Sequence, residues 1–599
     1  MIQSKADEWE QRAVEFLERR WILVTLLCWL GFCGWMIFEH WDQIRWFGLG
    51  DTDDNMRIMQ VRAWLHGQGW YDLRDYRMDP PFGANIHWSR LVDLPIAGLI
   101  LGLRPFLSGA GAERWAVAIA PMLPYLLLLF SLALVARRLL GALGYVLAFC
   151  AIFFAGSTNG MFTPERIDHH GWQLALLALS MAGIADPKKL RGGLVLGIST
   201  ALSLAIGLEM IIYLALAGVA MVLFWVEDAR EGDRLSAYAI SLGGSTAFCF
   251  LVFASNDNWN AVCDALSPVW LSDALLASAL MLILAWIPAA TWQRRLLLAV
   301  GAGLIISSFH ALTWPQCLQR LEGISPEAER LWLSHVKEAR PVWMHGWRIA
   351  TLILVLPVTG AIGWLLLAWS RWNEPGLRRR VIGSAMPGIA ASLLLFWQTR
   401  TGPAAQMMAA VGAAAIIWLL WPRAWNSRNP ILRVVGAVVV FIAGVGAIVP
   451  LVVDFIPEAP ATKRDQEIGK ANRLCASLWG LHPVALQPRG VVMTFVDLGP
   501  RLITLTHHDA IAGPYHRNWK QIVDVMNFWR GSADQAHRLA EKYHVNYVLS
   551  CPNSSTTTIF MSETPGGFYA QLQRNEVPDW LNPVSLPKDS PYRMWRVVG

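Results

Sequence analysis

The stretch "WILVTLLCWLGFCGWMIFE", from Trp21 to Glu39, decides the fold class of this protein. About 20 mostly apolar residues are enough for a helix to cross the hydrocarbon core of a bilayer. Similar stretches recur for most of the 599 residues, of which 55% are hydrophobic and only 16% charged. The sequence therefore predicts a polytopic α-helical membrane protein.

Short basic segments between the apolar stretches set the predicted topology, because cytoplasmic loops of membrane proteins are enriched in Lys and Arg. The segments are Arg19 with Arg20, Arg137 with Arg138, Lys188 to Arg191, Arg230 with Arg234, Arg294 with Arg295, Arg378 to Arg380, and Arg423 with Arg428. Placing them in the cytoplasm gives thirteen spans, near residues 21–39, 115–136, 139–157, 172–187, 192–207, 210–226, 236–254, 268–290, 296–313, 347–369, 381–399, 404–421 and 431–453. This odd count predicts a cytoplasmic N-terminus and an external C-terminal region.

Two domains follow from this topology. Residues 1–457 are expected to form the transmembrane domain, with a large first external loop at about residues 40–114, and residues 458–599 an external domain. The apolar piece at 94–107 would break the alternation of basic loops, so we expect an interfacial helix there. The first span is expected to be a retained anchor, because it is longer than a secretory signal and no small-residue cleavage site follows it.

Charge and cysteine usage exclude some functions. The net charge of +6 comes mostly from cytoplasmic loops and forms no basic stripe, so no nucleic-acid partner is expected. The chain has no Walker-type phosphate loop. Of the eight cysteines, Cys28, Cys33, Cys150 and Cys249 lie in spans, while two candidate disulfides, Cys263 with Cys317 and Cys475 with Cys551, lie on the outer face.

The unusual polar residues all fall on the predicted outer face. Asp51, Asp53 and Asp54 lie in "GLGDTDDNMRIMQVRAW", residues 48–64, and the next outer loop carries "TPERIDHHGWQ" with Glu165, Asp168, His169 and His170. A later loop carries Glu338 in "LWLSHVKEARPVW", and Arg400 follows another span. Carboxylates beside a bilayer require water, partners or a metal.

A metal site is the first interpretation of this convergence. Asp51, Asp168 and Glu338 offer the oxygen ligands that suit Mg²⁺ or Mn²⁺, and His170 adds an imidazole nitrogen. Other roles stay open for single residues. Asp53 or Asp54 is an alternative cap for a helix that begins near Asn55, and His169 is expected to pack or form hydrogen bonds.

Two further residues also have ordinary alternatives. Glu338 is equally consistent with a solvated helix residue, and Arg400 with an arginine that extends to the membrane interface.

These motifs resemble the catalytic subunit of oligosaccharyltransferases and its single-subunit bacterial and archaeal relatives, in the GT-C class of glycosyltransferases. Those proteins have thirteen spans, a large first external loop and an external C-terminal domain. They open the first loop with an aspartate followed six residues later by an arginine, as in Asp51 and Arg57. The resemblance implies that Asp51 is the functional acid, and that Asp168, His169 and His170 match the Asp-His-His form of the second motif.

Two later motifs also match, and one departs. "HVKEARP" keeps Val336, Glu338 and Pro341 of the family's third acidic motif, and Arg400 stands where the family places an arginine near the donor. The family's external domain carries "WWDYG", which recognises the hydroxyl residue of an Asn-x-Ser/Thr acceptor. Here "FVDLG", residues 495–499, keeps only Asp497 and the glycine, so recognition of that acceptor is not implied.

The C-terminal region predicts an α/β domain. "GVVMTFV" and "VNYVLSC" have the composition of buried strands, and a helical pattern lies between them near residues 531–543. Between the first strand and this helix, "LTHHDAIAGPYHRN" holds His516 and Arg517, which are candidates for contact with an acceptor or phosphate. A polar loop that covers the sheet is the alternative.

The resemblance and the outer-face carboxylates together predict a glycosyltransferase with a divalent metal, Mg²⁺ or Mn²⁺. It would transfer a sugar from a polyprenyl phosphate or pyrophosphate to a glycan or lipid at the periplasmic face of a bacterial inner membrane. Asp51, Asp168 and His170 would bind the metal, and Asp51 with Glu338 would act on the acceptor. Arg400, His87 and Arg90 would contact the donor, and Asp497, His516 and Arg517 the acceptor.

Protein N-oligosaccharyl transfer is the alternative acceptor chemistry. A transporter is the alternative of another class, for which Glu209 would be the intramembrane acid.

Overall fold

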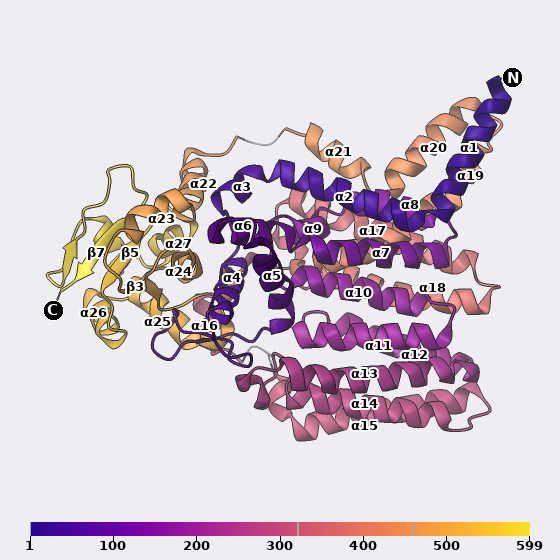
Figure 1. Cartoon of the computed structure of the whole chain (residues 1–599), viewed down its shortest axis with the longest axis horizontal. Coiled ribbons are helices and arrows are strands. Elements are labelled where there is room, and N and C mark those ends of the chain that lie inside the picture. The colour runs from indigo at the N-terminus through magenta and orange to yellow at the C-terminus, as the bar shows by residue number, and fades with distance from the viewer. Residues whose placement is uncertain (1, 320–322, 458–459, 599) are drawn as a thin grey trace.

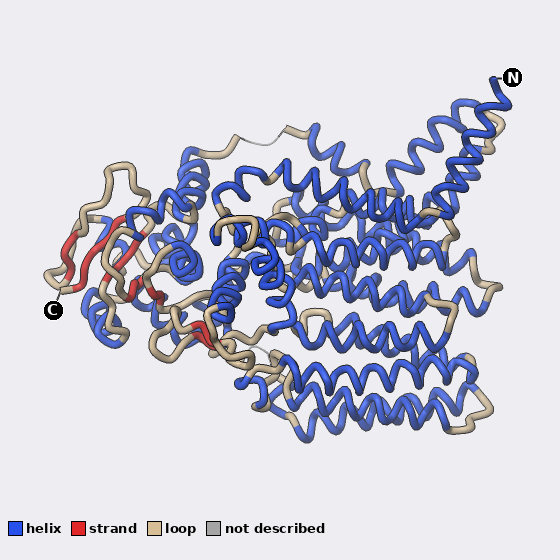
Figure 2. The backbone as a smooth tube through the Cα atoms, viewed as in Figure 1, coloured by secondary structure: helices blue, strands red, loops and turns tan. Residues whose placement is uncertain are grey.

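The computed structural model describes residues 2–319, 323–457 and 460–598. Figure 1 shows long helices packed side by side in a bundle, with the C-terminal elements gathered beyond one end of it. Figure 2 shows that the strands lie almost entirely in this C-terminal part. The protein is a multi-pass helical membrane protein with a C-terminal domain that contains a sheet, as the sequence predicts. The predicted start of that domain, at Glu458, lies outside the described residues.

Each of the thirteen predicted spans contains helix. The helices are α2 (Trp21–Glu39), α7 (Met122–Leu139), α8 (Gly144–Phe153), α10 (His170–Ala185), α11 (Lys189–Ile206), α12 (Ile211–Glu227), α13 (Gly232–Phe253), α14 (Pro268–Trp286), α15 (Trp292–Thr313), α17 (Trp347–Ser370), α18 (Pro375–Leu394), α19 (Gly402–Trp425) and α20 (Pro430–Gly444) with α21 (Ile448–Phe455). Among the described residues, eight helical segments have the length and hydropathy of a membrane span, and a bent pair, α8 with the segment 156–162, makes a ninth. The count of thirteen stays a prediction.

The prediction of one continuous span at 431–453 is wrong. Gly446 adopts φ +75°, a left-handed conformation that cannot continue a right-handed helix, and it separates α20 from α21. Elsewhere the bundle is held by close helix contacts. A Cβ on Gly363 of α17 would collide with the backbone of Gly412 on α19, so these two helices touch main chain to main chain.

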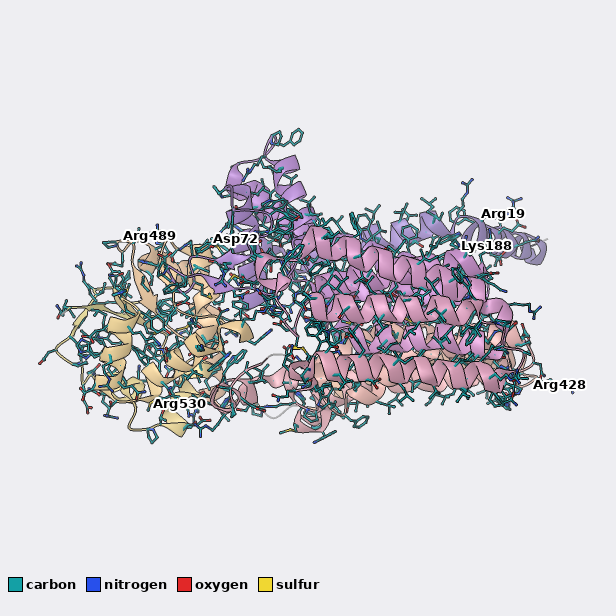
Figure 3. The ribbon with its side chains drawn as sticks, turned by 90° about the horizontal axis from the view of Figure 1, so that it is seen from below. Arg19, Asp72, Lys188, Arg428, Arg489 and Arg530 are labelled. Atoms are coloured by element: carbon teal, nitrogen blue, oxygen red, sulfur yellow. A yellow bond between two sulfur atoms is a disulfide. The ribbon has the colours of Figure 1, made fainter. Side chains whose placement is uncertain are left out.

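The basic segments share one end of the bundle. Figure 3 shows Arg19, Lys188 and Arg428 at the end far from the C-terminal domain, and Arg489 and Arg530 in that domain. Segments predicted to face the same side of the membrane therefore lie on the same side of the structure. The carboxylate-rich loops lie at the other end.

The first large loop folds into its own layer against that end. It contains α3 (Trp41–Trp46), α4 (Thr52–Leu65), the antiparallel pair β1 (Arg74–Asp75) and β2 (Ala84–Asn85), α5 (Arg90–Leu103) and α6 (Gly109–Ile119). The helix predicted at 94–107 is α5, which begins earlier because Ser89 caps it by accepting from the backbone N–H of Leu91 (3.3 Å).

A buried ion cluster fixes α4 against α5. Asp93 accepts from Arg57 (2.9 Å) and from Arg90 (3.0 Å), and all three side chains are fully buried. The guanidinium of Arg57 also lies 4.3 Å from the ring centre of Trp88. Both arginines therefore have structural partners inside the loop.

The C-terminal domain is built on a five-stranded mixed sheet in the order β4-β3-β5-β7-β6. Its strands are β3 (Val491–Met493), β4 (Asp509–Ala510), β5 (Tyr547–Ser550), β6 (Leu581–Pro583) and β7 (Arg593–Val597). The helices α22 (Lys463–Cys475), α23 (Leu478–Ala485), α24 (Gly499–Leu505), α25 (Trp519–Arg530), α26 (Ala533–Lys542), α27 (Ser555–Glu563) and α28 (Phe568–Gln573) surround it. The two strands and the helix predicted from the sequence are β3, β5 and α26.

This domain shares a hydrophobic core with the first loop. Met56, Met78 and Trp88 of the loop are buried in the same cluster as Val492 and Trp529 of the domain. The domain is therefore docked on the loop through apolar packing. Both candidate disulfides are present, Cys263–Cys317 with Cα atoms 5.4 Å apart and Cys475–Cys551 with Cα atoms 6.3 Å apart.

Candidate functional site

The first turn of α4 presents three carboxylates. The helix begins at Thr52, and Asp51 is its N-cap, since Asp51 Oδ1 accepts from the backbone N–H of Asp53 (3.2 Å) and from the Thr52 hydroxyl (3.1 Å). The expected start near Asn55 and the capping role for Asp53 or Asp54 are therefore wrong. Asp51 itself has the extended backbone that a cap needs, and its second carboxylate oxygen takes no part in the cap.

A second segment faces this turn from the loop before α10. Arg166 lies between the carboxylates, with Nη1 donating to Asp51 Oδ2 and to Asp54 Oδ2 (3.3 Å), and Nη2 lying 2.7 Å from Asp168 Oδ2. Asp54 Oδ1 accepts from the backbone N–H of Asp168 (3.0 Å). The two loops are thus joined by one guanidinium that compensates three negative charges.

Burial and neighbouring charges shift the pKa values of these carboxyl groups in different directions. Asp54 is 1% exposed and Asp168 is 3% exposed. Burial raises the pKa of Asp54 well above its usual value, although Arg166 opposes the shift. Burial acts in the same direction on Asp168, but the charges of Arg166 and His170 outweigh it and lower the pKa of that carboxyl. For Asp53, burial and the neighbouring charges of Asp51 and Asp168 raise the pKa to about 7.

His170 completes one side of the cluster. It is the first residue of α10, and its backbone N–H donates to Asp168 Oδ1 (2.9 Å). Its Nδ1 atom is buried without a hydrogen-bond partner and lies 3.5 Å from Asp168 Oδ2, the oxygen that also faces Arg166 Nη2. A buried imidazole nitrogen beside a buried carboxylate oxygen is a donor pair that a divalent metal satisfies. Asp51 Oδ2 contacts the same guanidinium, so in this structure Arg166 lies between Asp51 and Asp168, two of the predicted metal ligands.

The neighbouring histidine, His169, forms a hydrogen bond with another acidic residue, Glu209. His169 Nε2 lies 3.0 Å from Glu209 Oε1, and Gln173 donates to Glu209 Oε2 (2.5 Å). Glu209 lies in the loop between α11 and α12, where a Cβ on Gly207 would collide with its carboxylate. His169 therefore makes the hydrogen bond expected of it. Glu209 is a loop residue at the same end of the bundle and one-third exposed.

The C-terminal domain reaches this site through its "FVDLG" segment. Residues 496–498 form a short 3₁₀ turn on which Asp497 is exposed, and α24 follows directly. From α24, Arg501 donates to Asn55 Oδ1 (3.2 Å), while the Tyr515 hydroxyl donates to the carbonyl of Thr52 (2.9 Å). The domain is thus hydrogen-bonded to the same helical turn that carries the acidic residues.

Glu338 and Arg400 lie together on other outer segments. The carbonyl of Glu338 accepts from the Thr399 hydroxyl (3.2 Å), and its side chain is exposed. Arg400 lines a cavity of about 510 Å³ together with Glu329, Arg340 and Trp397. Within the described parts of the chain, no hydrogen bond or ion pair joins Glu338 to Asp51.

The remaining candidates separate into two positions. Arg90 is fully buried on Asp93 and on backbone carbonyls, so we leave it out of the proposed donor contacts. His87 lies instead with His516 and Arg517 around Asp264. Glu165 is 3% exposed and adopts φ +70°, with both carboxylate oxygens buried and without a hydrogen-bond partner.

Sequence analysis missed three functional candidates: Arg166, Gln173 and Asp264. Arg166 stands inside the motif "PERIDHH", so an arginine between acidic residues was a signal for a bridging role. Gln173 lies one helical turn after His169, the spacing that places two side chains on one face. Asp264 follows a disulfide cysteine, but its sequence separation from His516 is 252 residues and leaves no local signal.

Comparison with solved structures identifies the fold. No protein-family model and no curated protein matches the sequence. The archaeal oligosaccharyltransferase AglB from Archaeoglobus fulgidus, in complex with an inhibitory peptide and a dolichol-phosphate, matches with a TM-score of 0.67 and 15% identity over 95% of this chain and 73% of that one. The oligosaccharyltransferase of the same organism, tethered to an acceptor peptide containing the NVT sequon, matches with a TM-score of 0.66 and 14% identity over 94% and 72%.

The same archaeal protein in complex with zinc and sulfate matches with a TM-score of 0.61 and 16% identity, over 88% of this chain and 67% of that one. The chain therefore has the same fold as these oligosaccharyltransferases, as the resemblance predicts.

Proposed function

We propose that this protein transfers a sugar or oligosaccharide from a polyprenyl phosphate or pyrophosphate to an acceptor on the outer face of the membrane. One observation carries the proposal. Asp51, Asp54 and Asp168 surround a single arginine at one end of a GT-C-type bundle, beside an unpaired buried nitrogen of His170. Buried carboxylates with perturbed pKa values are concentrated in this way at functional sites.

Asp51, Asp168 and His170 would hold a divalent metal, and we expect Mg²⁺ or Mn²⁺ because oxygen ligands predominate. A structure of the archaeal protein of similar fold contains zinc and sulfate, which supports a divalent metal in a protein of this fold. When bound, the metal would compensate the negative charge of the departing phosphate. Arg166 would then be released from the carboxylates and remain beside the leaving group as a second positive charge.

The reaction exchanges one bond at the anomeric carbon for another. The bond from that carbon to the phosphate oxygen breaks, the acceptor atom forms a new bond to the same carbon, and the acceptor loses a proton. Asp51 and Glu338 would orient the acceptor and take this proton. Arg400 would contact the donor phosphate, because its cavity opens on the outer side and contains a second arginine, Arg340.

The acceptor is proposed to be a glycan or a lipid. The archaeal proteins of similar fold bind a peptide, and one carries an NVT sequon. Here the segment that would meet a sequon has Phe495 and Val496 buried, and exposes Asp497 as its polar group. Asp497 would hydrogen-bond an acceptor hydroxyl, whereas the two tryptophans and the tyrosine of the family's "WWDYG" are missing from this segment.

The cellular setting follows from the same proposal. The basic ends of the helices would face the cytoplasm of a bacterial inner membrane, and the C-terminal domain the periplasm. The two disulfides on the opposite side from the basic loops support an oxidising compartment there. Polyprenyl-linked sugars displayed in the outer leaflet would then reach the site from the bilayer.

The test is a transfer assay in liposomes that contain polyprenyl-linked sugars extracted from bacterial membranes. The purified protein, supplied with Mn²⁺, should release polyprenyl phosphate or pyrophosphate and modify an added glycan or lipid acceptor. Asp168→Asn should reduce release at least about a hundredfold, the cost of losing a group that stabilises transition-state charge. Modification of a sequon peptide instead would establish protein N-glycosylation. Equal release by both proteins would remove Asp168 from the site, and no release by the natural protein would reject the transferase and favour transport.

A further inference from the structure

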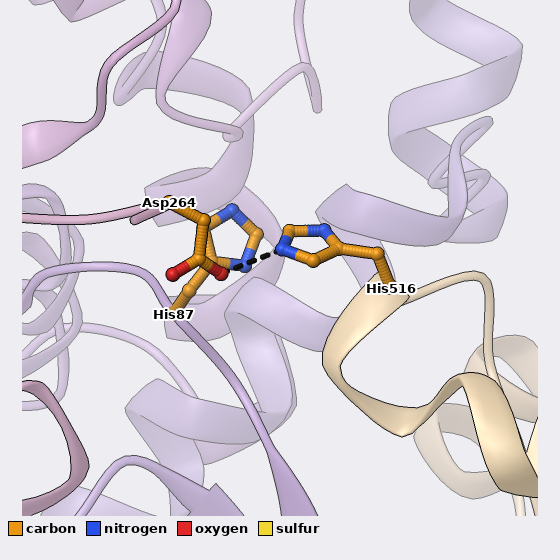
Figure 4. A group of neighbouring side chains, drawn as sticks. All are labelled: His87, Asp264 and His516. Atoms are coloured by element: carbon orange, nitrogen blue, oxygen red, sulfur yellow. Dashed lines mark hydrogen bonds and ion pairs between the residues drawn. The ribbon is translucent and has the colours of Figure 1, made fainter. Parts of the chain in front are cut away.

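A second group of metal-ligating side chains lies between the first loop and the C-terminal domain. Figure 4 shows His87, Asp264 and His516 facing one another from three segments far apart in the sequence. One ligand atom from each can be chosen so that all three lie within 4.8 Å of one another. His516 Nε2 lies 2.6 Å from Asp264 Oδ2, and the rings of His87 and His516 are 4.5 Å apart between centres.

The group is shielded from solvent and incompletely bonded. The side chains of Asp264 and His516 are 9% and 15% exposed. His87 Nδ1 is buried and has no hydrogen-bond partner. In the described chain, His87 therefore has a buried nitrogen whose hydrogen-bonding capacity the protein does not use, and leaving such an atom unpaired is unfavourable.

The three segments are held in place by bonds outside the group. Asn85 donates its backbone N–H to Asn518 Oδ1 (3.0 Å), and Asn518 Nδ2 donates to the carbonyl of Asn85 (3.1 Å). Asp264 follows Cys263, which is anchored by its disulfide to Cys317. The positions of the potential ligands are thus fixed before any ion binds, which is a condition for a tight metal site.

We propose that His87, Asp264 and His516 form a zinc-class metal site that joins the first loop to the C-terminal domain. Two imidazoles and one carboxylate form a ligand set that binds Zn²⁺ in preference to Mg²⁺, because Mg²⁺ is bound mainly by oxygen ligands. The proposal does not depend on the proposed transferase activity.

Arg517 determines what kind of ion this site accepts. Its Nε and Nη2 atoms each donate to Asp264, at 2.7 Å to Oδ2 and 2.7 Å to Oδ1. This ion pair orients the carboxylate and compensates its charge, as partners behind a metal ligand commonly do. Because the carboxylate is already neutralised, an ion bound mainly by oxygen gains little here, whereas an ion that bonds strongly to imidazole is retained.

The site would be a structural metal site beside the candidate active site. His87 precedes Trp88, whose ring packs against His169 (5.6 Å between centres) and against Tyr515 (5.7 Å). Tyr515 in turn precedes His516. A metal at this position would therefore hold together the two segments that cover the histidine side of the acidic cluster.

The experiment is a zinc count on the full-length protein in detergent, after incubation with Zn²⁺ and removal of free ions. Asp168→Asn provides the background, because it disables the candidate active-site cluster. That protein should retain one equivalent of zinc, and adding His516→Gln or His87→Gln should remove it. His87→Gln leaves the Asp264–Arg517 ion pair intact, so its loss of zinc would not reflect a broken ion pair.

His507→Gln is the matched control, since His507 is an exposed histidine of the same domain that bonds a backbone carbonyl. It should leave the zinc content unchanged. Bound zinc should also slow proteolytic cleavage of the segments where the first loop contacts the domain. This protection is expected in the Asp168→Asn protein and not in the double variants. Absence of zinc from Asp168→Asn, or retention of a full equivalent by both double variants, would overturn the proposal. A failed transfer assay would leave this result unaffected.

Discussion

Replacing Arg166 by methionine tests the architecture of the acidic cluster most directly. Methionine keeps most of the side-chain volume and removes the only positive charge seen between Asp51, Asp54 and Asp168 in the described structure. The protein without metal should become less stable, while its affinity for Mn²⁺ should rise. Both effects would have the same cause, because Arg166 lies where we propose that the metal binds.

The size of the effect follows from the two buried pairs. The carboxylates of Asp54 and Asp168 are 2% and 0% exposed, and Arg166 lies 3.3 Å and 2.7 Å from them. Removing one partner of a buried ion pair costs about 3–5 kcal/mol, because it leaves an uncompensated charge. If Mn²⁺ must displace Arg166 in the natural protein, its binding free energy is reduced by the cost of breaking these ion pairs, about 3 kcal/mol. The variant does not have this cost. Its affinity should then rise about a hundredfold, at 1.4 kcal/mol for each factor of ten.

Mn²⁺ binding is measured by the loss of the free-ion electron paramagnetic resonance signal, and stability by melting in detergent with EDTA. Arg74→Met is the matched control, since it removes an ion pair with Asp257 (2.8 Å) outside the acidic cluster. It should leave Mn²⁺ affinity unchanged. An Arg166→Met protein that melts like the natural one in EDTA and binds Mn²⁺ within threefold of it would refute the placement of Arg166 at the metal position.

Three further predictions concern the surrounding residues. Asp168→Asn should lower Mn²⁺ affinity at least about tenfold, because it removes a buried ligand charge, and the same resonance titration checks this. Glu165 should make stability depend on pH. Burial raises its pKa to about 7 from 4.5, so the folded protein binds the proton more tightly and loses stability as pH rises from about 5 to 8. The loss is at most about 3 kcal/mol, and Glu165→Gln should flatten the melting temperature across this range, whereas parallel curves would contradict it. Gly207→Ala should place a methyl group against Glu209 and disturb the hydrogen bond between Glu209 and His169. Transfer activity should fall while Mn²⁺ binding stays intact. Unchanged transfer would show that this hydrogen bond is dispensable.

The sequence predicts best what is local. Asp168 and His170 are two residues apart at the start of a helix, so their proximity required no knowledge of the fold. The position of Asp51 followed from a motif and from topology. Its capping role did not, because any of three nearby aspartates satisfies the preference for an acidic cap, and the backbone direction selects one.

Contacts between distant segments could not be predicted in the same way. Asp264 and His516 are 252 residues apart, and their pairing depends on how the C-terminal domain docks on the first loop. That docking is decided by apolar residues such as Met78 and Trp88, which in sequence resemble any interfacial residues. Likewise, the split between α20 and α21 depends on the left-handed conformation of Gly446, and a single glycine in an apolar stretch does not require a break.

The first turn of α4 connects the chemistry of the site to the domain above it. Asp51 uses one oxygen to cap this turn and directs the other at Arg166. The N-terminal end of the helix carries a partial positive charge, which offsets part of the repulsion among the three aspartates gathered there. The carbonyl of Thr52 accepts from Tyr515, and Asn55 accepts from Arg501 (3.2 Å). The C-terminal domain is therefore hydrogen-bonded to the turn on both sides of Asp53 and Asp54. Because Asp51 belongs to that turn, a shift of the domain on binding an acceptor would move the carboxylate, and contact with the acceptor is thereby coupled to the geometry of the metal ligands.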